Sequence, residues 1–309
     1  MKLLFTLLVL LSITISYTRA DTYGVGIWNN GTSVNVGLID LTTGNQAALK
    51  LSIQGFNYQA SNLQGSTYNY ATKMLSFYVL QLSNKAPTLY VINCNTWAVV
   101  SRTTFNFQYQ YAGLASTNTA ANNLYTVMSN SAAVFPSKID PKTNVLSKFD
   151  SIIGSYRGSV YVPTINSYYV AFTNQTGLYI RVYNSNNQLT TESAFGFGGN
   201  SYQVNNAPLN LVYSPINQGV LAQVWMTDPF NRDYYALAYL NWNAGVFDVT
   251  SMDGYTGDVF LTTIPDSNNQ WLTYSFAYSF GQYTIYTFSA YTNSFVSFRP
   301  YETPILSAF

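Results

Sequence analysis

The sequence contains no histidine and a single cysteine, Cys94, among its 309 residues. Without histidine, the chain can build neither a Ser-His-Asp nor a Cys-His nucleophile system, and it has no imidazole ligand for zinc, copper or non-haem iron. Without a second cysteine, it cannot close an internal disulfide. A chain of this length can nevertheless bury a core large enough to fold without such a crosslink. We therefore expect packing and backbone hydrogen bonds to hold the fold together.

Charged residues are also scarce, making up 8% of the chain, with 13 basic and 12 acidic residues. This near-neutral balance argues against nucleic acid as a partner, which needs a basic stripe, and against an anionic membrane surface. The chain is nonetheless 48% hydrophobic and contains 28 tyrosines. Tyr, Asn, Gln, Ser and Thr must cover most of the surface, which suits uncharged hydrogen-bonding ligands such as glycans. A general compositional bias toward Asn and Thr would produce the same surface without any ligand.

Long apolar runs are missing except at the N-terminus. Lys2 precedes an apolar stretch from Leu3 to Tyr17, and Thr18-Arg19-Ala20 then offers a small residue at a cleavage point. This order is typical of a secretory signal peptide. The sequence thus predicts residues 1–20 as a signal peptide and residues 21–309 as one secreted, extracellular domain with no membrane span. An uncleaved anchor is the alternative, although the apolar run is shorter than the roughly 20 residues that a bilayer span needs.

A repeated turn motif runs through the rest of the chain. Six strand-like runs end in an apolar residue, followed by Asp, Asn or Ser and usually by Thr three residues later. The motif recurs at spacings of 44 to 57 residues, and its turn residues are Asp40, Asn93, Asp140, Asn184, Asn241 and Ser289. An Asp or Asn here can accept hydrogen bonds from the backbone two residues on. One such hairpin per repeat indicates a β-propeller.

A second polar turn precedes each of the last five hairpins by 18 to 24 residues, and these turns centre on Lys73, Asn122, Asn166, Asn217 and Asn268. Each of these units therefore has four strands, as a propeller blade does. The N-terminal unit has only three, and the apolar run 303–309 would supply the fourth and remove the open sheet edges. We predict an all-β fold, a single β-propeller of six four-stranded blades closed by the C-terminal strand. Seven blades are the alternative if Gly55–Gln64 or Gly196–Asn206 hide further strands.

Two of the hairpins carry a likeness to known proteins. Leu89-Tyr90-Val91-Ile92-Asn93 followed by Thr96, and Ile139-Asp140 with Thr143-Asn144, resemble the repeats of the quinoprotein and YVTN-type propeller superfamily. The likeness extends over most of the mature chain and implies the propeller architecture. The tryptophan found late in quinoprotein repeats is missing after Asp40 and Asp140, so the resemblance does not imply a pyrroloquinoline quinone cofactor.

Two N-glycosylation sequons fall in predicted turns, Asn30-Gly31-Thr32 and Asn174-Gln175-Thr176. In a secreted chain, a turn brings the asparagine to solvent, where a glycan can be attached. We therefore predict Asn30 and Asn174 as glycosylation sites.

Six of the twelve acidic residues lie between Asp228 and Asp266. Within this cluster, Asp253 and Asp258 flank Gly254-Tyr255-Thr256-Gly257 and could direct two carboxylates and backbone carbonyls toward Ca²⁺, the only cofactor we consider. Turn-forming aspartates in solvated loops would give the same pattern. A pair of these carboxylates could alternatively act as acid and base in glycoside cleavage.

Aromatic residues in hairpin turns are candidate ligand contacts. Trp97 and Trp242 follow the turn residues Asn93 and Asn241, and an exposed indole there could stack on a sugar ring; in the alternative, both fill the packing between blades. Cys94 lies in the same turn as Trp97. It could form a disulfide with another molecule, or remain a passive, unpaired thiol.

The sequence supports three classes of function. A secreted propeller that binds a glycan or an extracellular protein requires only a rigid ring that presents variable loops. A carboxylate-dependent glycan hydrolase or lyase is the alternative, and a structural matrix or coat protein is the third.

Overall fold

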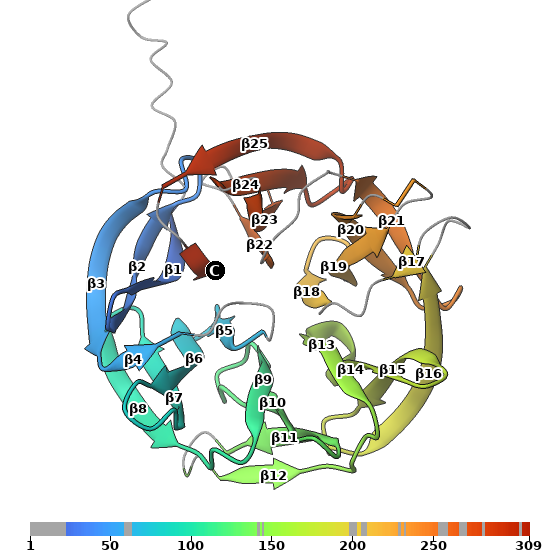
Figure 1. Ribbon diagram of the computed structural model, residues 1–309, viewed down its shortest axis with the longest axis horizontal. Helices are drawn as coiled ribbons and strands as arrows, with labels where there is room; N and C mark the ends of the chain where they lie inside the picture. The colour runs from blue at the N-terminus through green and yellow to red at the C-terminus, as the bar shows by residue number, and fades with distance from the viewer. Residues whose placement is uncertain are drawn as a thin grey trace, which may run out of the picture.

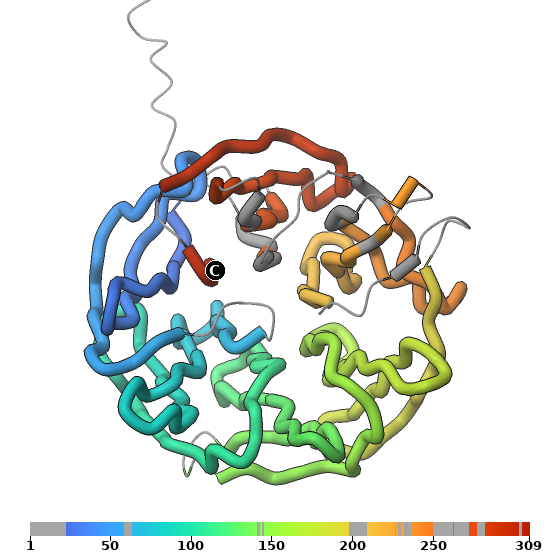
Figure 2. Tube along the Cα trace, in the orientation of Figure 1, coloured from blue at the N-terminus to red at the C-terminus, as the bar shows by residue number. Residues whose placement is uncertain are grey.

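The computed structural model describes residues 23–58, 64–140, 143, 145–197, 203–204, 209–227, 230–231, 233–252, 259–265, 271–279, 282–302 and 305–309. Nearly all regular structure in these residues is β-strand, arranged in a ring (Figure 1). The chain follows the ring once, from the blue N-terminal strands to the red C-terminal ones (Figure 2). The all-β prediction is therefore confirmed. Within the described residues, no helix has the length and apolar character to cross a membrane.

The described strands form six antiparallel groups, which we call blades and number along the chain. In each blade the first strand is the innermost and the fourth is the outermost. Blade 1 consists of β26 (Ile305–Ala308) as first strand, β1 (Tyr23–Asn30), β2 (Ser33–Asp40) and β3 (Gln46–Gln54). Blade 2 consists of an interrupted first strand, β4 (Phe56–Asn57) and β5 (Ser66–Asn69), with β6 (Met74–Gln81), β7 (Pro87–Asn93) and β8 (Ala98–Thr104). Blade 3 consists of β9 (Gln110–Ser116), β10 (Leu124–Ser129), β11 (Val134–Ile139) and β12 (Leu146–Lys148).

The second half of the ring repeats this arrangement. Blade 4 consists of β13 (Ser155–Val162), β14 (Ser167–Asn174), β15 (Gly177–Tyr183) and β16 (Leu189–Phe197), with the 3₁₀ helix η2 (Pro163–Ile165) after its first strand. Blade 5 consists of β17 (Gln203–Val204) and β18 (Asn210–Ser214) as first strand, β19 (Gly219–Thr227), β20 (Asp233–Asn241) and β21 (Val246–Met252). Blade 6 consists of β22 (Val259–Pro265), β23 (Trp271–Ser279), β24 (Gln282–Ser289) and β25 (Phe295–Tyr301).

The two stretches that would have carried an extra blade contribute short strands to existing ones. In the described part of the first stretch, β4 pairs with β6 of blade 2. In the described part of the second, β17 pairs with β19 of blade 5. Blades 2 and 5 thus each have an interrupted first strand, and the two blades lie across the ring from each other (Figure 1).

The C-terminal strand closes the ring, as expected. β26 pairs with β1 in antiparallel register, with Ala308 opposite Gly26 and Ser307 opposite Ile27. Two backbone hydrogen bonds between Val25 and Phe309, of 2.7 and 2.9 Å, extend the ladder beyond the strand. The first and last segments of the described chain therefore share one blade, and β26 covers the inner edge of β1.

Side-chain oxygens close the repeated hairpins, as the motif predicts. Backbone N–H groups two or three residues on donate to the carboxylate or amide oxygen at the first turn position, over 2.7–3.0 Å for Thr42 to Asp40, Asn95 to Asn93 and Thr143 to Asp140. Residues near the end of the hairpins adopt positive φ, including Gly44, Trp97, Asn187, Gly245 and Asn293. The polar residue thus stabilises the turn, and Gly or Asn removes the strain of the left-handed backbone at most of these positions.

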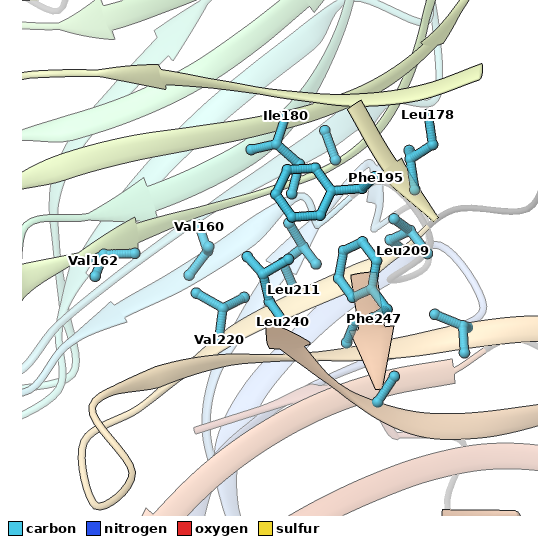
Figure 3. Packing of buried hydrophobic residues seen from close by; sticks show 14 of the residues in the cluster. Val160, Val162, Leu178, Ile180, Phe195, Leu209, Leu211, Val220, Leu240 and Phe247 are labelled. Atoms are coloured by element: carbon cyan, nitrogen blue, oxygen red, sulfur yellow. The ribbon is translucent and has the colours of Figure 1, made fainter. Parts of the chain in front are cut away.

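The core lies between the blades, because each blade packs its faces against its neighbours. The largest cluster joins blades 4 and 5, where Phe195 of β16 packs against Phe247 of β21 with ring centroids 6.0 Å apart (Figure 3). These blades are also joined at their outer edge, since Gly196 and Phe197 pair in parallel with Val246 and Phe247. A parallel pair of two fourth strands shows that equivalent strands of these blades run in the same direction.

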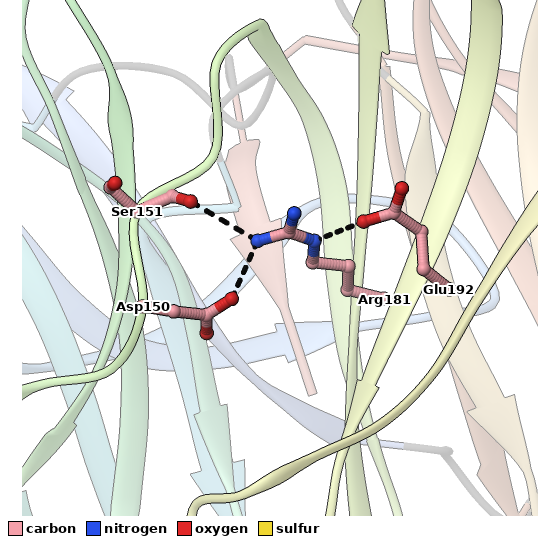
Figure 4. A network of polar contacts seen from close by, with 4 residues as sticks. All are labelled: Asp150, Ser151, Arg181 and Glu192. Carbon is pink, nitrogen blue, oxygen red and sulfur yellow. Dashed lines mark hydrogen bonds and ion pairs between the residues drawn. The ribbon is translucent and has the colours of Figure 1, made fainter.

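Ion pairs are few, as the composition requires. Arg181 of β15 forms two salt bridges, one with Glu192 of β16 and one, at 2.7 Å, with Asp150 before blade 4 (Figure 4). The same guanidinium donates to the carbonyl of Ser151 over 3.1 Å. This cluster ties the connection that follows blade 3 to the outer half of blade 4.

Alternation of strand direction gives the ring two distinct faces. The face that we call the cavity face carries the turns between first and second strands and the hairpins between third and fourth strands. Two contacts join these segments there: Cys94 N–H donates to the Lys73 carbonyl over 2.9 Å, and Asn217 donates to the Ala290 carbonyl over 2.8 Å.

The other face, which we call the sequon face, carries the turns between second and third strands and the connections between blades. Gly55, in the connection from blade 1 to blade 2, joins two of these turns. Its N–H donates to the Thr32 carbonyl over 2.9 Å, and its carbonyl accepts from the Leu82 N–H over 2.9 Å. The two faces are therefore built from different sets of loops.

Candidate functional site

The inner strands surround a cavity of about 540 Å³. All six blades contribute to its lining, through β5, β9, β13, β18, Thr262 of β22 and Phe309 beyond β26. The lining also includes Tyr70, Asn118, Pro163 and Pro215, which lie in or beside turns between first and second strands, so the cavity extends to the cavity face. Its volume falls in the range of ligand pockets, about 300–1,000 Å³.

The described lining contains no charged side chain. Hydroxyl and amide groups alternate with apolar ones, and the polar members are Gln64, Ser66, Thr67, Tyr68, Tyr70, Ser116, Asn118, Tyr161, Asn210, Tyr213 and Thr262. Such a surface can donate and accept many hydrogen bonds without a Coulomb preference for either sign of charge. It therefore suits a neutral ligand with several hydroxyl or amide groups.

Aromatic rings form part of the wall. Tyr68 stacks on Phe309 with centroids 6.2 Å apart and meets Tyr70 edge-on at 5.0 Å. Burial, with a smaller contribution from Cys94, raises the pKa of the Tyr68 phenol to about 12. The phenol therefore stays protonated at neutral pH, and Tyr68 presents a flat ring and a neutral hydroxyl to the cavity.

Gln64 connects the blades across the centre of the ring. Its Nε2 donates to the Leu211 carbonyl over 2.7 Å, and its Oε1 accepts from the Ser159 N–H over 2.7 Å. Its own carbonyl accepts from the Leu114 N–H over 2.8 Å. The residue holds a left-handed backbone, with φ of 49°. One side chain at the start of blade 2's inner strand therefore satisfies backbone groups of blades 4 and 5, and it limits the cavity on the side of the sequon face.

A buried chain of hydroxyls holds the wall at the closure of the ring. Tyr58 OH lies 2.8 Å from Ser66 Oγ, which in turn lies 2.6 Å from Ser307 Oγ of β26. Asn29 fixes Tyr58 through two hydrogen bonds of 2.9 Å to its backbone. Because burial raises the pKa of Tyr58 to about 12, against the lowering by its serine partners, this network stays neutral.

Amide side chains order the rim of the cavity. Asn118 Oδ1 accepts from the backbone N–H of Tyr70 over 2.6 Å, and Asn69 Nδ2 donates to the Thr119 carbonyl over 2.8 Å. These contacts join the first turns of blades 2 and 3. Next to them, η2 ends at Asn166, whose φ of 52° and ψ of 48° are left-handed. Amide side chains and one short 3₁₀ helix therefore order the rim.

The predicted ligand contacts Trp97 and Trp242 lie in hairpins of the cavity face, on blades 2 and 5. Both are half-buried. Trp242 packs between Tyr169 and Phe195, with ring centroids 5.3 and 5.0 Å away. Trp97 packs beside the core of blades 1 and 2, with Lys50 Nζ 6.0 Å from its ring. Neither lines the cavity, and the structure does not bring them together, so a shared role in binding stays a prediction.

The other predicted sites divide into exposed, half-buried and undescribed ones. Asn30 and Asn174 are both exposed at hairpin tips. Cys94 is a half-buried free thiol whose pKa burial raises to about 12, so it is protonated at neutral pH; its disulfide with another molecule stays a prediction. Asp253 and Asp258 lie outside the described residues, and within those residues no three Asp, Glu or Cys side chains gather as a metal site would require.

The lining residues were missed by sequence reasoning, although a signal for them exists. Many of them form pairs two positions apart at the end of a first strand, as Tyr68 and Tyr70, Ser116 and Asn118, Tyr161 and Pro163, and Tyr213 and Pro215. Once those turns are placed, the residues just before them must surround the ring axis. The repeated turn motif marks the hairpins between third and fourth strands. The cavity residues instead lie near the preceding turns, those between first and second strands.

Comparison with solved structures identifies the architecture. TolB from Acinetobacter baumannii matches with a TM-score of 0.65 at 12% identity, covering 94% of this chain and 67% of that one. The nidogen/laminin complex gives 0.54 at 10% identity, over 93% and 97% of the two chains. A periplasmic gluconolactonase from Pseudomonas aeruginosa gives 0.51 at 9% identity, over 93% and 99%.

The chain folds as a β-propeller. No family model matches it, and no curated protein matches it by sequence. At these identities the likeness extends to the fold alone, and propellers carry binding sites and enzymes alike.

Proposed function

We propose that this protein is a secreted binding module whose central cavity binds an uncharged, hydroxyl-rich ligand. The ligand that we favour is a glycan. The observation that carries the proposal is the lining of the cavity, in which all six blades contribute and no described residue is charged. Sugar rings present apolar faces and hydroxyl edges. Tyrosine rings and Asn or Ser side chains match the two respectively.

Secretion is part of the same proposal. It rests on the signal-peptide pattern of residues 1–20, which lie outside the described residues, and on the two exposed sequons. An extracellular protein partner that inserts an uncharged loop into the cavity is the next occupant to consider, because the same hydroxyl and amide groups would serve it.

The enzyme alternative depends on residues other than those that line the cavity. A hydrolase or lyase of the carboxylate-dependent type needs two converging acids. The described lining has none, whereas Asp253 and Asp258 are not among the described residues. Propeller enzymes do occur among the similar structures, including an oligogalacturonate lyase from Vibrio parahaemolyticus with a TM-score of 0.50 at 8% identity. Because the described lining has no carboxylate, we favour binding without cleavage.

The decisive experiment compares the cavity with the hairpin tryptophans. Wild-type protein, a Tyr68→Ala/Tyr213→Ala variant and a Trp97→Ala/Trp242→Ala variant are applied to an array of neutral and acidic glycans, and hits are titrated by calorimetry. We expect a neutral glycan to bind the wild type and the tryptophan variant. Loss of each cavity ring should weaken binding by roughly tenfold, since an aromatic contact contributes about 0.5–1.5 kcal/mol beyond its buried area.

Each other outcome changes the proposal in a defined way. Binding that the tryptophan variant loses and the cavity variant keeps would place the site at the hairpins. Cleavage of a bound glycan that Asp253→Asn/Asp258→Asn abolishes would establish the enzyme. If the correctly folded protein binds no glycan at all, the glycan proposal fails, and ordered self-assembly would then favour the structural role.

A further inference from the structure

The two sequons occupy the same position in opposite blades. Asn30 ends β1 and Asn174 ends β14, and each of these is the second strand of its blade. Both turns therefore lie on the sequon face, and blades 1 and 4 lie across the ring from each other (Figure 1). The sequence spacing alone does not reveal this equivalence, because blade 1 receives its first strand from the C-terminus.

The Asn174 turn presents its amide nitrogen for modification. Asn174 Oδ1 accepts from Thr176 Oγ1 over 2.7 Å and from the Thr176 N–H over 2.8 Å. Gly177 N–H is a third donor to the same oxygen at 3.2 Å. No described residue accepts a hydrogen bond from Nδ2, and the side chain is exposed. The sequon hydroxyl and the acceptor amide are thus already in contact within an accessible turn.

The Asn30 turn is equally open. Asn30, Gly31 and Thr32 are all exposed. Gly31 has a φ of 60°, and a Cβ atom built on it would meet no atom within 4 Å. The tip of the turn at Gly31 therefore projects into open space, while the Thr32 carbonyl is hydrogen-bonded to Gly55.

The same face carries the most exposed large apolar side chains of the described chain. Ile153 is 82% exposed, Phe230 78% and Phe107 76%; Ile153 and Phe107 lie in connections between blades, and Phe230 lies in the turn between β19 and β20. Ile153 is next to the Asn174 turn, because Ser155 pairs with Thr173 and a Cβ on Gly154 would lie 2.5 Å from the Thr173 carbonyl oxygen. Covering a side chain this exposed removes apolar area from water, which is favourable.

We propose that Asn30 and Asn174 carry N-linked glycans, and that the glycan on Asn174 covers Ile153. In the transfer, Nδ2 displaces a lipid diphosphate from the anomeric carbon of an oligosaccharide donor. A nitrogen–carbon bond forms, the bond between that carbon and the diphosphate oxygen breaks, and the amide gives up one proton. The sequon face becomes a glycan-shielded surface, while the cavity face stays bare. This inference depends on secretion and not on the identity of the cavity ligand.

Intact-mass measurement of the full chain, secreted from eukaryotic cells, tests occupancy. We expect the wild type to lose two glycans on treatment with peptide-N-glycosidase, and Asn30→Gln and Asn174→Gln to lose one each. Asn130→Gln is the matched control, because Asn130 accepts the same type of turn hydrogen bonds, from Ala132 and Ala133, without a sequon. Conversely, Ala132→Thr creates a sequon in that equivalent turn and should add a third glycan.

Sedimentation velocity of the enzymatically deglycosylated wild type tests the covering role without any mutation. We expect its profile to shift from monomer to larger species, and we expect deglycosylated Ile153→Ser to remain monomeric. A wild-type chain that is not secreted, or whose mass does not fall by two glycans, overturns the proposal of modification. A deglycosylated wild type that remains monomeric overturns the proposal that the glycan covers Ile153.

Discussion

The two faces of the ring are built from different sets of loops, and they expose different chemistry. On the cavity face, Asn69, Asn118 and Asn166 order the turns around an opening lined by tyrosines. On the sequon face, the connections between blades expose Ile153 and Phe107, and the turns carry the sequons. In the described chain, large apolar side chains protrude most on the sequon face.

The difference follows from the way a propeller is connected. Because equivalent strands run in the same direction around the ring, every turn of one kind falls on one face. Changes in one set of turns can therefore alter ligand binding without altering the opposite surface. The inner strands run from one face to the other. Gln64 joins the inner strands of blades 4 and 5 through hydrogen bonds to Ser159 and Leu211.

Removal of residues 305–309 should have the largest effect, because it takes away the first strand of blade 1 and the Phe309 wall of the cavity. Ile305 and Ala308 are buried, and Ser307 bonds to Ser66. We expect a loss of more than about 4 kcal/mol in the free energy of unfolding, since buried apolar area and a row of ladder hydrogen bonds disappear together. Urea unfolding followed by fluorescence measures it. Ser307→Ala, which removes only the hydroxyl, is the control and should cost about 1 kcal/mol. A truncated chain as stable as the wild type would show that pairing of β26 with β1 does not stabilise the ring.

Alkaline pH should have the next largest effect, through Tyr58 at the closure of the ring and Tyr68 in the cavity wall. Burial raises the folded-state pKa of Tyr58 and Tyr68 to about 12, above the roughly 10 of an unfolded tyrosine. Between about pH 10 and pH 12 the unfolded chain therefore releases protons that the folded chain keeps, and stability falls as the pH rises. Below about pH 10 this contribution is fully present, and without histidine stability should be flat between about pH 6 and pH 8.

Urea midpoints across this pH range measure the dependence. Tyr58→Phe should make the alkaline decline less steep. An identical slope for Tyr58→Phe and the wild type would show that Tyr58 does not contribute.

Replacing Gln64 tests the hydrogen bonds that join the inner strands at the centre of the ring. It should have the smallest effect of the three changes. Gln64→Leu leaves the Ser159 N–H and the Leu211 carbonyl without their side-chain partners. We expect a loss of about 1–3 kcal/mol, the desolvation cost of an unpaired buried polar group. Chemical denaturation provides the measurement. Gln54→Leu, on the exposed edge of β3, should change stability by less than about 0.5 kcal/mol. Equal values for the two variants would mean that Gln64 does not hold the blades together.

Much of the architecture could be predicted from local signals. The Asp and Asn of the hairpins use their own side chains to close the turn, so residues such as Asp40 and Asp140 reveal their structure without distant partners. The closing strand β26 could be predicted because blade 1 lacked one strand and the C-terminus had one to spare. Even the proline in Val134–Ile139 did not obscure β11, since apolar and β-branched residues surround it.

The site could not be predicted in the same way. Trp97 and Trp242 both lie in hairpins between third and fourth strands and were natural candidates, but whether an indole faces solvent depends on the neighbouring blade. Tyr169 and Phe195 of blade 4 partly cover Trp242. The cavity residue Tyr68 owes its position to Phe309, which is 241 residues away along the chain.

The sequence by itself determined the strands, the turns and their repetition, because hydrogen bonds within a turn and alternation within a strand act between residues a few positions apart. Only the tertiary structure decided which residues meet at the centre, which face carries the sequons and which aromatic rings are covered. Those outcomes depend on the number of blades, the direction of their strands and the closure by β26. These are properties of the whole ring, which no short segment contains.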